Sequence, residues 1–209
     1  LTYLQLKTRP YTMITIYASP EKKISSPDSL KKLGEILREE VTKATPKHEI
    51  EVAILSFCIK YGEDIVGVGC NATELNNEAN IKNHAPQISK GLRLYDSFKN
   101  GSYGIWLAPA EKENISDAPR EKNLTSHSFS ELGSILRNMV NKAAPNREIE
   151  VAILSFCIKY GDIITQDNHN ALELNEEAEL KDHRSDLSTG INLYKSFITG
   201  AYGISFIPT

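Results

Sequence analysis

The sequence predicts an α+β fold: a tandem duplication of a ferredoxin-like domain, with the element order strand, helix, strand, strand, helix, strand in each copy. Two observations support this prediction, a long internal repeat and, within each repeat, a succession of strand-like and helix-like hydrophobic patterns. Right-handed crossovers turn that order into an antiparallel sheet with both helices on one face. If residues 49–61 and 148–160 are helices instead, the chain is mostly α and this topology fails.

The internal repeat is clearest in a run of fourteen residues, Glu49 to Gly62, which recurs unchanged as Glu148 to Gly161. The offset of 99 residues holds without a gap on both sides of this run. A period of this length indicates a small domain, because solenoid repeats are shorter. The chain therefore divides into a first copy, a polar linker without periodicity and a second copy, which we place at residues 1–109, 110–128 and 129–209.

The first element of each copy is an entrance strand, borrowed from the N-terminal segment or from the linker. Residues 4–6 and 11–17 alternate apolar and polar positions, as half-buried strands do. An amphipathic helix follows at residues 29–44, where apolar side chains recur at i, i+3 and i+4, and its second copy starts at Phe129. Pro46 ends the first of these helices.

The repeated fourteen-residue run is the hardest element to assign. Its content of Ile, Val, Phe, Cys and Tyr favours a buried strand, and two glutamates alternate with apolar residues at positions 49–52 before the run becomes fully apolar. Pro46 before the run and Gly62 at its end suit a buried helix equally well. We expect a strand, and the helix remains the alternative.

The rest of each copy is predicted to contain two strands and a second helix. Residues 61–66 are typical of a hairpin into a short strand, and residues 71–85 are polar with weak helical periodicity. Residues 88–99 show the apolar spacing of an amphipathic helix, which Asn100-Gly101 ends. Residues 103–109 form the closing strand, and the second copy repeats this order.

The repeated run should lie in the core of both copies, because fourteen mostly apolar residues would be an aggregation hazard on a surface. Its thiols, Cys58 and Cys157, are expected to be buried and inert. Lys60 and Lys159 follow the apolar part of the run and should extend to water. We expect residues 30–109 and 129–208 to share one fold, with these side chains buried: Ile50, Val52, Ile54, Leu55, Phe57, Ile149, Val151, Ile153, Leu154 and Phe156.

Composition and charge narrow the function classes. The 209 residues carry 24 Lys and Arg against 27 Asp and Glu, so no excess of positive charge attracts nucleic acid or an anionic membrane. No apolar run reaches the length of a membrane span. Three cysteines cannot form a disulfide framework and favour an intracellular location over secretion. We therefore expect a soluble, intracellular protein with no nucleic-acid partner and no membrane span.

The candidate catalytic residues are His84 and His183, which occupy the same place in both copies, ten residues after Glu74 and Glu173. An imidazole with a carboxylate can perform acid–base chemistry or bind a metal. No second His or Cys lies at a metal-ligand spacing from either histidine. We expect solvated histidines with no catalytic role, no metal and no cofactor.

The function that these observations favour is a non-enzymatic structural or protein-interaction module, a covalent pseudo-dimer of two homologous domains. Identity between the copies concentrates in apolar positions and turn glycines, as packing demands, and no matched cluster of catalytic residue types is present. A protein partner or self-association follows, and the Asn-, Lys- and Ile-rich composition would suit a viral or host-interacting protein. The alternative is a small-molecule-binding enzyme, a duplicated α+β barrel with His84 and His183 at the pocket.

Overall fold

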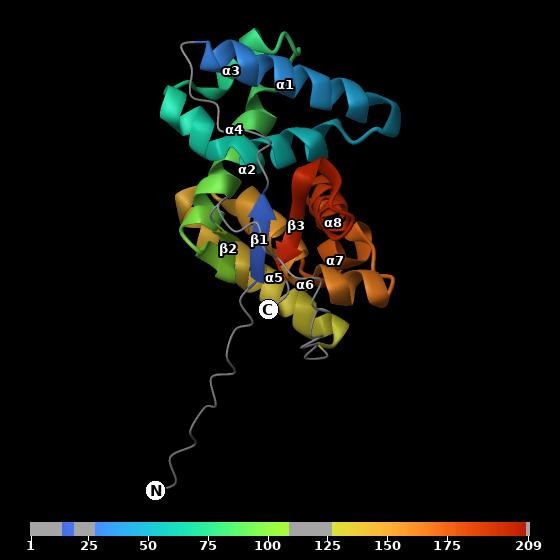
Figure 1. Ribbon diagram of the computed structural model, residues 1–209. Helices are drawn as coiled ribbons and strands as arrows, with labels where there is room; N and C mark the ends of the chain where they lie inside the picture. Colours follow the sequence, from blue (N-terminus) through green and yellow to red (C-terminus); the bar gives the residue numbers. More distant parts are fainter. Residues whose placement is uncertain (1–13, 19–27, 109–126, 208–209) are drawn as a thin grey trace, which may run out of the picture.

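The structure, a computed structural model, describes residues 14–18, 28–108 and 127–207. Within these residues each copy has four α-helices and a closing strand in the same order (Figure 1). In the first copy they are α1 (Ser29–Ala44), α2 (Ile50–Val68), α3 (Ala72–Glu78), α4 (Ala85–Lys99) and β2 (Ile105–Ala108). In the second copy they are α5 (Phe129–Ala143), α6 (Ile149–Gln166), α7 (Ala171–Glu177), α8 (Arg184–Ile198) and β3 (Ile204–Ile207). A further strand, β1 (Ile14–Ala18), precedes both copies.

The fold is mostly helical, and the prediction of a strand for the repeated run is wrong. The run forms most of α2 in the first copy and of α6 in the second. Residues 61–66 continue α2 and do not form a hairpin. The ferredoxin-like topology is therefore not confirmed, and the helical alternative holds for residues 49–61 and 148–160, apart from the glutamate that precedes each helix.

The burial of α2 explains why the sequence pattern was ambiguous. This helix packs against α1, α4 and the second copy's α8, and every side chain from Val52 to Ile59 is buried, whichever way it points. A helix buried on all sides loses the 3.6-residue period that separates helix from strand. The alternating glutamates mark the beginning of the helix, where Glu51 lies in the first turn and interacts favourably with the helix dipole.

The other predicted elements agree with the structure. The helix expected at residues 29–44 is α1, and the helix expected at 88–99 is α4, which begins three residues earlier. The closing strand is β2, and the polar stretch 71–85 contains the short helix α3. Of the two alternating N-terminal segments, the second, residues 11–17, overlaps β1, which extends to Ala18. Residues 4–6 and 11–13 lie outside the described residues, as does most of the linker.

Three apolar clusters form the interior. Each copy has a core of its own, which in the first copy joins α1, α2, α3 and α4 around Phe57 and in the second joins the equivalent helices around Phe156. A third cluster lies between the copies and includes residues of β1, such as Ile16. The side chains expected in the core are buried, except that Ile50 and Ile149 are only partly buried because they begin their helices.

The two copies meet through the same elements on each side. The first copy's α2 contacts α8, and the second copy's α6 contacts α4, so the arrangement is that of a two-fold symmetric dimer within one chain. The sheet lies across this boundary in the order β2-β1-β3 (Figure 1). Strand β1 runs parallel to β2 and antiparallel to β3. One strand therefore joins the closing strands of both copies.

Among the described residues, no helix combines the length and the apolar character needed to cross a membrane.

Candidate functional site at the interface between the copies

A largely buried lysine on α4 is the centre of a polar cluster at the boundary between the copies. The Nζ atom of Lys90 lies 3.0 Å from Oε1 of Glu51 and 3.0 Å from Oδ1 of Asp186. A third carboxylate oxygen, Oε2 of Glu150, lies 4.0 Å away. Only 12% of the lysine side chain is exposed, so this charge depends on its partners rather than on water.

The elements of both copies position these groups. Glu51 and Glu150 occupy equivalent positions in the two copies of the repeated run. Glu51 lies in the first turn of α2, and Glu150 lies in the first turn of α6. Lys90 lies in the middle of α4, and Asp186 lies in the first turn of α8. The pseudo-two-fold arrangement brings the two helix starts together, and α4 and α8 supply the side chains that face them.

Hydrogen bonds extend the cluster on both sides. Thr189 Oγ1 donates to the second oxygen of Glu51 at 3.1 Å. Arg93 donates to Oε2 of Glu150 at 3.1 Å and to the backbone carbonyl of Arg147 at 3.1 Å. The Nδ1 atom of His183 lies 3.1 Å from the other oxygen of Asp186. The network therefore links the first copy's α2 and α4 to the second copy's α6 and α8.

Lys90 keeps its charge in this setting. Burial alone would lower its pKa, but the hydrogen bonds that Lys90 donates to Asp186 and Glu51, together with the negative charges of these carboxylates, outweigh that effect and raise the pKa above its usual value. The ammonium is therefore charged at neutral pH and holds the neighbouring carboxylates together.

The two copies contribute unequal charge to the cluster. On α4, Lys90 and Arg93 contact the second copy, and Gln87 lies one turn before Lys90. The equivalent positions on α8, 99 residues later, are Thr189, Asn192 and Asp186. If a first copy paired with another first copy, the boundary would hold an excess of cations. If a second copy paired with another second copy, the carboxylates would meet without a cation. The charges therefore favour pairing of unlike copies.

A tyrosine from each copy contacts the start of the other copy's central helix. The hydroxyl of Tyr202 donates to Oε2 of Glu49 at 3.1 Å, and burial together with this carboxylate raises the pKa of Tyr202 to about 12. Its counterpart Tyr103 lies near Glu148; burial, and then this carboxylate, raise the pKa of Tyr103. Both tyrosines have positive φ, 57° and 58°, a backbone region that non-glycine residues rarely adopt, and the same strained turn occurs in both copies.

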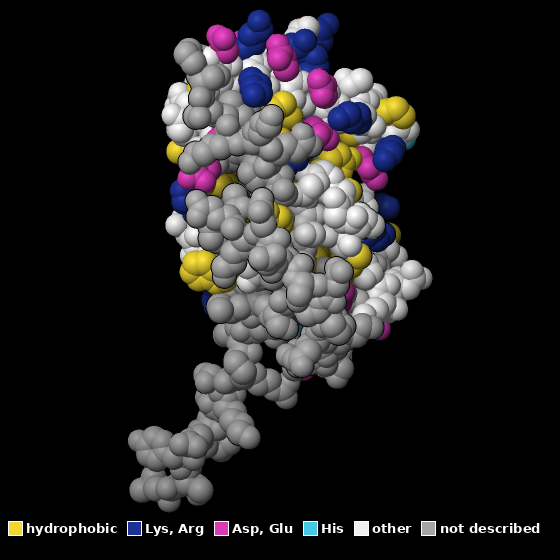
Figure 2. Space-filling view, viewed as in Figure 1, with side chains coloured by type: hydrophobic (Ala, Val, Ile, Leu, Met, Phe, Trp, Pro, Cys, Tyr) yellow, Lys and Arg dark blue, Asp and Glu magenta, His cyan; other side chains and the backbone are white. Residues whose placement is uncertain are grey.

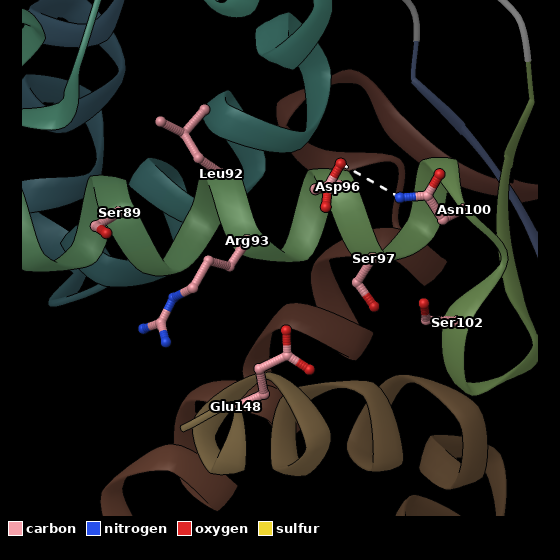
Figure 3. A pocket seen from close by; sticks show the side chains of 8 residues that line it. All are labelled: Ser89, Leu92, Arg93, Asp96, Ser97, Asn100, Ser102 and Glu148. Carbon is pink, nitrogen blue, oxygen red and sulfur yellow. Dashed lines mark hydrogen bonds between the residues drawn. The ribbon is translucent and has the colours of Figure 1, made fainter. Parts of the chain in front are cut away.

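A polar depression of about 310 Å³ opens beside the cluster (Figure 3). One wall is α4, which contributes Ser89, Arg93 and Asp96, and Glu148 at the start of α6 lines the opposite side (Figure 3). Arg93 points from α4 to the side on which Glu148 lies. Asp96 accepts a hydrogen bond from Asn100 at 3.3 Å. This depression lies on the surface at the boundary between the copies, and no histidine lines it.

The predicted site residues lie at the beginnings of four different helices. Glu74 and Glu173 complete capping boxes at the beginnings of α3 and α7, so each carboxylate accepts a hydrogen bond from the backbone of its own helix start. His84 and His183 precede α4 and α8. The backbone N–H of His84 donates to Asn76 Oδ1, and its Nδ1 is buried without a hydrogen-bond partner among the described residues.

Sequence reasoning did not find the central residues of the cluster. The predicted residues are those that recur in both copies, and Lys90, Arg93 and Asp186 do not recur. The signal that could have found them is the opposite one, a change of charge between equivalent positions on helices that otherwise repeat closely. Only His183 belongs both to the predicted set and to the observed network.

Other expectations about chemistry concern thiols, lysines and metals. Cys58 and Cys157 are buried, as expected, and burial raises the pKa of both thiols, so neither is activated. Lys159 does not reach water freely: it is half-buried and donates to the Tyr103 carbonyl, and burial lowers its pKa. In the ranges that the structure describes, no group of three or more His, Cys, Asp or Glu side chains could hold a metal ion.

Comparison with protein families identifies the repeated unit. Residues 29–100 and residues 128–199 each match the family described as HTH-like domain, and together they make up more than half of the chain. The chain belongs to the HTH-like domain family. The matches cover α1 to α4 in the first HTH-like domain and α5 to α8 in the second, and leave the three strands outside. No curated protein and no solved structure matches the chain.

Proposed function

We propose that the chain is a non-enzymatic protein-interaction module in which two HTH-like domains form a covalent pseudo-dimer. The observation that carries the proposal is the Lys90 cluster, which gives the two domains opposite charge where they meet. Fusing two domains in one chain replaces the entropy cost of association with a linker. The fused pair then presents two related surfaces in one defined orientation, with the division into residues 1–109, linker 110–128 and 129–209 expected from the sequence.

The packing between sheet and helices supports a scaffold rather than a small-molecule enzyme. The space beneath the sheet is filled by the shared apolar cluster, in which Ile16, Leu94 and Leu193 are fully buried. The polar depression beside Arg93 lies outside this cluster and lacks a histidine. The alternative enzyme would need His84 or His183 to act on a bound molecule, and substitution of either by alanine would then abolish turnover while the fold persists.

Nucleic-acid binding is the second candidate, because the family match favours it. In a helix-turn-helix reader the second helix of the motif is exposed and enters the major groove. Here α4 and α8 lie against the central helices and the opposite domain, and the two cations at the centre of α4 bind carboxylates. The short helices before them carry exposed acids, including Glu74, Glu173 and Glu176, which would repel phosphates.

The visible surface does not supply a basic face either. On the side shown in Figure 2, acidic and basic side chains are intermingled around α1 at the top of the molecule, and no continuous basic area is visible. A helix-turn-helix protein needs such an area to neutralise phosphates. These charges favour a protein partner over nucleic acid.

The pseudo-dimer is tested by separating the two domains. Residues 1–109 and 110–209, produced as two chains, are expected to form a one-to-one complex when mixed, and each should prefer the other over itself in analytical ultracentrifugation. The matched variants are Lys90→Glu, which should weaken the complex at least tenfold, and Lys31→Glu, an exposed change on α1 that should leave it unchanged. Equal self-association of either half would contradict the proposal.

The nucleic-acid alternative is tested with the full chain. Fluorescence anisotropy with a labelled random-sequence duplex should give a Kd weaker than about 100 µM at physiological salt, the weak end of non-specific DNA binding. Binding near 1 µM with a steep salt dependence would replace the interaction proposal with nucleic-acid binding.

A further inference from the structure

The position of β1 shows that the sheet is built around the pseudo-two-fold axis. In the β1–β2 ladder Ile16 is paired with Leu107, and in the β1–β3 ladder the same residue is paired with Phe206. Leu107 and Phe206 are equivalent positions, 99 residues apart. The axis that relates the two HTH-like domains therefore passes through the sheet at Ile16.

Each domain contributes one side of a slot for a single strand. The closing strands β2 and β3 are not paired with each other, and the hydrogen bonds across the centre of the sheet all run through β1. Because β1 is parallel to β2 and antiparallel to β3, the two closing strands run in opposite directions, and any strand between them must be parallel to one and antiparallel to the other. The slot therefore offers one parallel and one antiparallel partner to a strand that lies in it in either orientation.

The floor of the slot selects small or branched apolar side chains at alternate positions. Ile16 is fully buried and Ala18 is 6% exposed, and both belong to the cluster shared by the domains, against which Ile14 also packs. The intervening residues, Thr15 and Tyr17, are only partly buried, as the two-residue period of a strand requires. The five residues of β1 are thus held by hydrogen bonds to two neighbouring strands and by three side chains that point into the apolar cluster.

We propose that the slot between β2 and β3 is a strand-binding site that a second copy of this chain can fill with its own β1. Strand β1 precedes α1 by ten residues, 19–28, a connection that can extend to roughly 33–36 Å. Its exchange breaks no contact between the two HTH-like domains, because β1 lies outside both domains and is joined to them only through residues 19–28. The exchanged and unexchanged forms make the same ladders, so concentration decides between them.

The closed form is expected at low concentration. A strand tethered by a short connection is present at an effective concentration of about 1 mM, so chains at micromolar concentration should keep their own β1. Chains unfolded and refolded together near millimolar concentration should exchange it. This inference stands on the sheet alone and does not depend on the proposed function.

Disulfide trapping between two full-length variants tests the exchange. The register pairs Tyr17 with Ser205, so one chain carries Tyr17→Cys and the other Ser205→Cys, both with Cys70→Ser to remove the partly exposed thiol. After joint refolding at high concentration and oxidation, we expect a cross-linked heterodimer, at least tenfold more abundant than from the control pair Lys31→Cys and Ser205→Cys. Equal yields from the two pairs would overturn the proposal.

Peptide binding gives an independent measurement on a chain whose own strand is displaced. In the full-length variant Ile16→Asp a charged side chain replaces the buried one, and a labelled peptide of residues 11–20 should bind at least tenfold more tightly than to the unaltered chain. Trp106, the one tryptophan of the chain, pairs with Thr15 and reports the seating of the strand by its fluorescence. The same peptide carrying Ile16→Asp should not bind. Equal binding of both peptides would also overturn the proposal.

Discussion

The phenylalanines of the repeated run show the energetics of each domain at the scale of one residue. Phe57 and Phe156 are almost fully buried, and each ring lies 5.0 Å from a tyrosine ring one turn later. Substitution of either by alanine should lower the free energy of unfolding by about 3–5 kcal/mol, because a cavity replaces a close-packed ring. Urea denaturation measures this change.

A matched control lies on the same helix as Phe57. Val66 is 64% exposed, and Val66→Ala should change stability by less than about 0.5 kcal/mol. If Phe57→Ala or Phe156→Ala costs less than about 1 kcal/mol, the helix does not form the core of that domain.

The thiols supply a second prediction for single residues. The Sγ atoms of Cys58 and Cys157 are buried and lie near the carbonyls of Ile88 and Leu187, whereas Cys70 is partly exposed. At pH 8 a colourimetric thiol reagent should therefore modify one cysteine of the native chain rapidly, and all three after unfolding. Rapid modification of two or three in the native chain would contradict the packing.

The same thiols predict a dependence of stability on pH. Burial raises the pKa of Cys58 and Cys157 in the folded chain above the value of 9.0 expected when exposed. The unfolded chain therefore loses these protons first, so the stabilising contribution is complete below pH 9 and is lost as the pH rises further. Denaturation between pH 8 and 10.5 should show this decline, and Cys58→Ala with Cys157→Ala should reduce its slope. An unchanged slope would mean that other groups cause it.

At the scale of the element, glycines decide how closely the helices approach. A Cβ atom added to Gly62 of α2 would lie 2.2 Å from the Tyr95 ring of α4, whereas a Cβ on Gly67 of the same helix would meet nothing within 4 Å. Gly62→Ala should therefore destabilise the chain by about 1–3 kcal/mol through overpacking. Gly67→Ala should stabilise it by up to about 1 kcal/mol, because alanine favours helix.

Thermal unfolding of the two variants compares these effects directly. Because both substitutions are glycine to alanine within α2, their difference in Tm reports the contact with Tyr95 and not helix propensity. A Tm for Gly62→Ala equal to or above that of Gly67→Ala would show that α2 and α4 are not in close contact.

The elements also show why the sequence of α2 indicates a strand. The residues of α2 are the apolar and β-branched types that strands prefer, and their burial on all sides removes the helical period. The exposed helices α1 and α4 keep one polar face, so the same reasoning identified both correctly. Local patterns assign an element well when one of its faces meets water and poorly when none does.

At the scale of the whole molecule, the Lys90 cluster should contribute strongly to the association of the domains. Lys90→Ala leaves the buried carboxylate of Asp186 without its cation, and it should cost about 2–5 kcal/mol, the range for truncating one partner of a buried charge pair. The control Lys31→Ala, on the exposed face of α1, should cost less than about 0.5 kcal/mol. Urea denaturation of the full chain measures both.

A charge exchange separates the pair interaction from general damage. Lys90→Asp places another carboxylate beside Asp186, and adding Asp186→Lys restores an opposite pair across the boundary. The double variant should therefore be more stable than the sum of the two single changes by at least about 1.5 kcal/mol. Additive effects would show that Lys90 and Asp186 do not interact.

The candidate site could be predicted only in part, because its residues are far apart in the sequence. The repeat placed Glu51 and Glu150 at equivalent positions, but Lys90 meets Asp186 from 96 residues away. Such a contact depends on how two folded domains pack, and no local spacing records it. The histidines were found because they recur, and of these only His183 joins the network.

The repeat, the amphipathic helices, the closing strands and the burial of the fourteen-residue run follow from the order of residues, because each reflects hydrophobic periodicity or identity that is local in the chain. The helical state of that run, the pairing of unlike domains around Lys90 and the sharing of β1 by both domains were decided by tertiary structure. Each of these depends on which surfaces meet after folding: the run is apolar in either conformation, and Ile16 reaches its two partners only when the pseudo-two-fold axis brings β2 and β3 to either side of it.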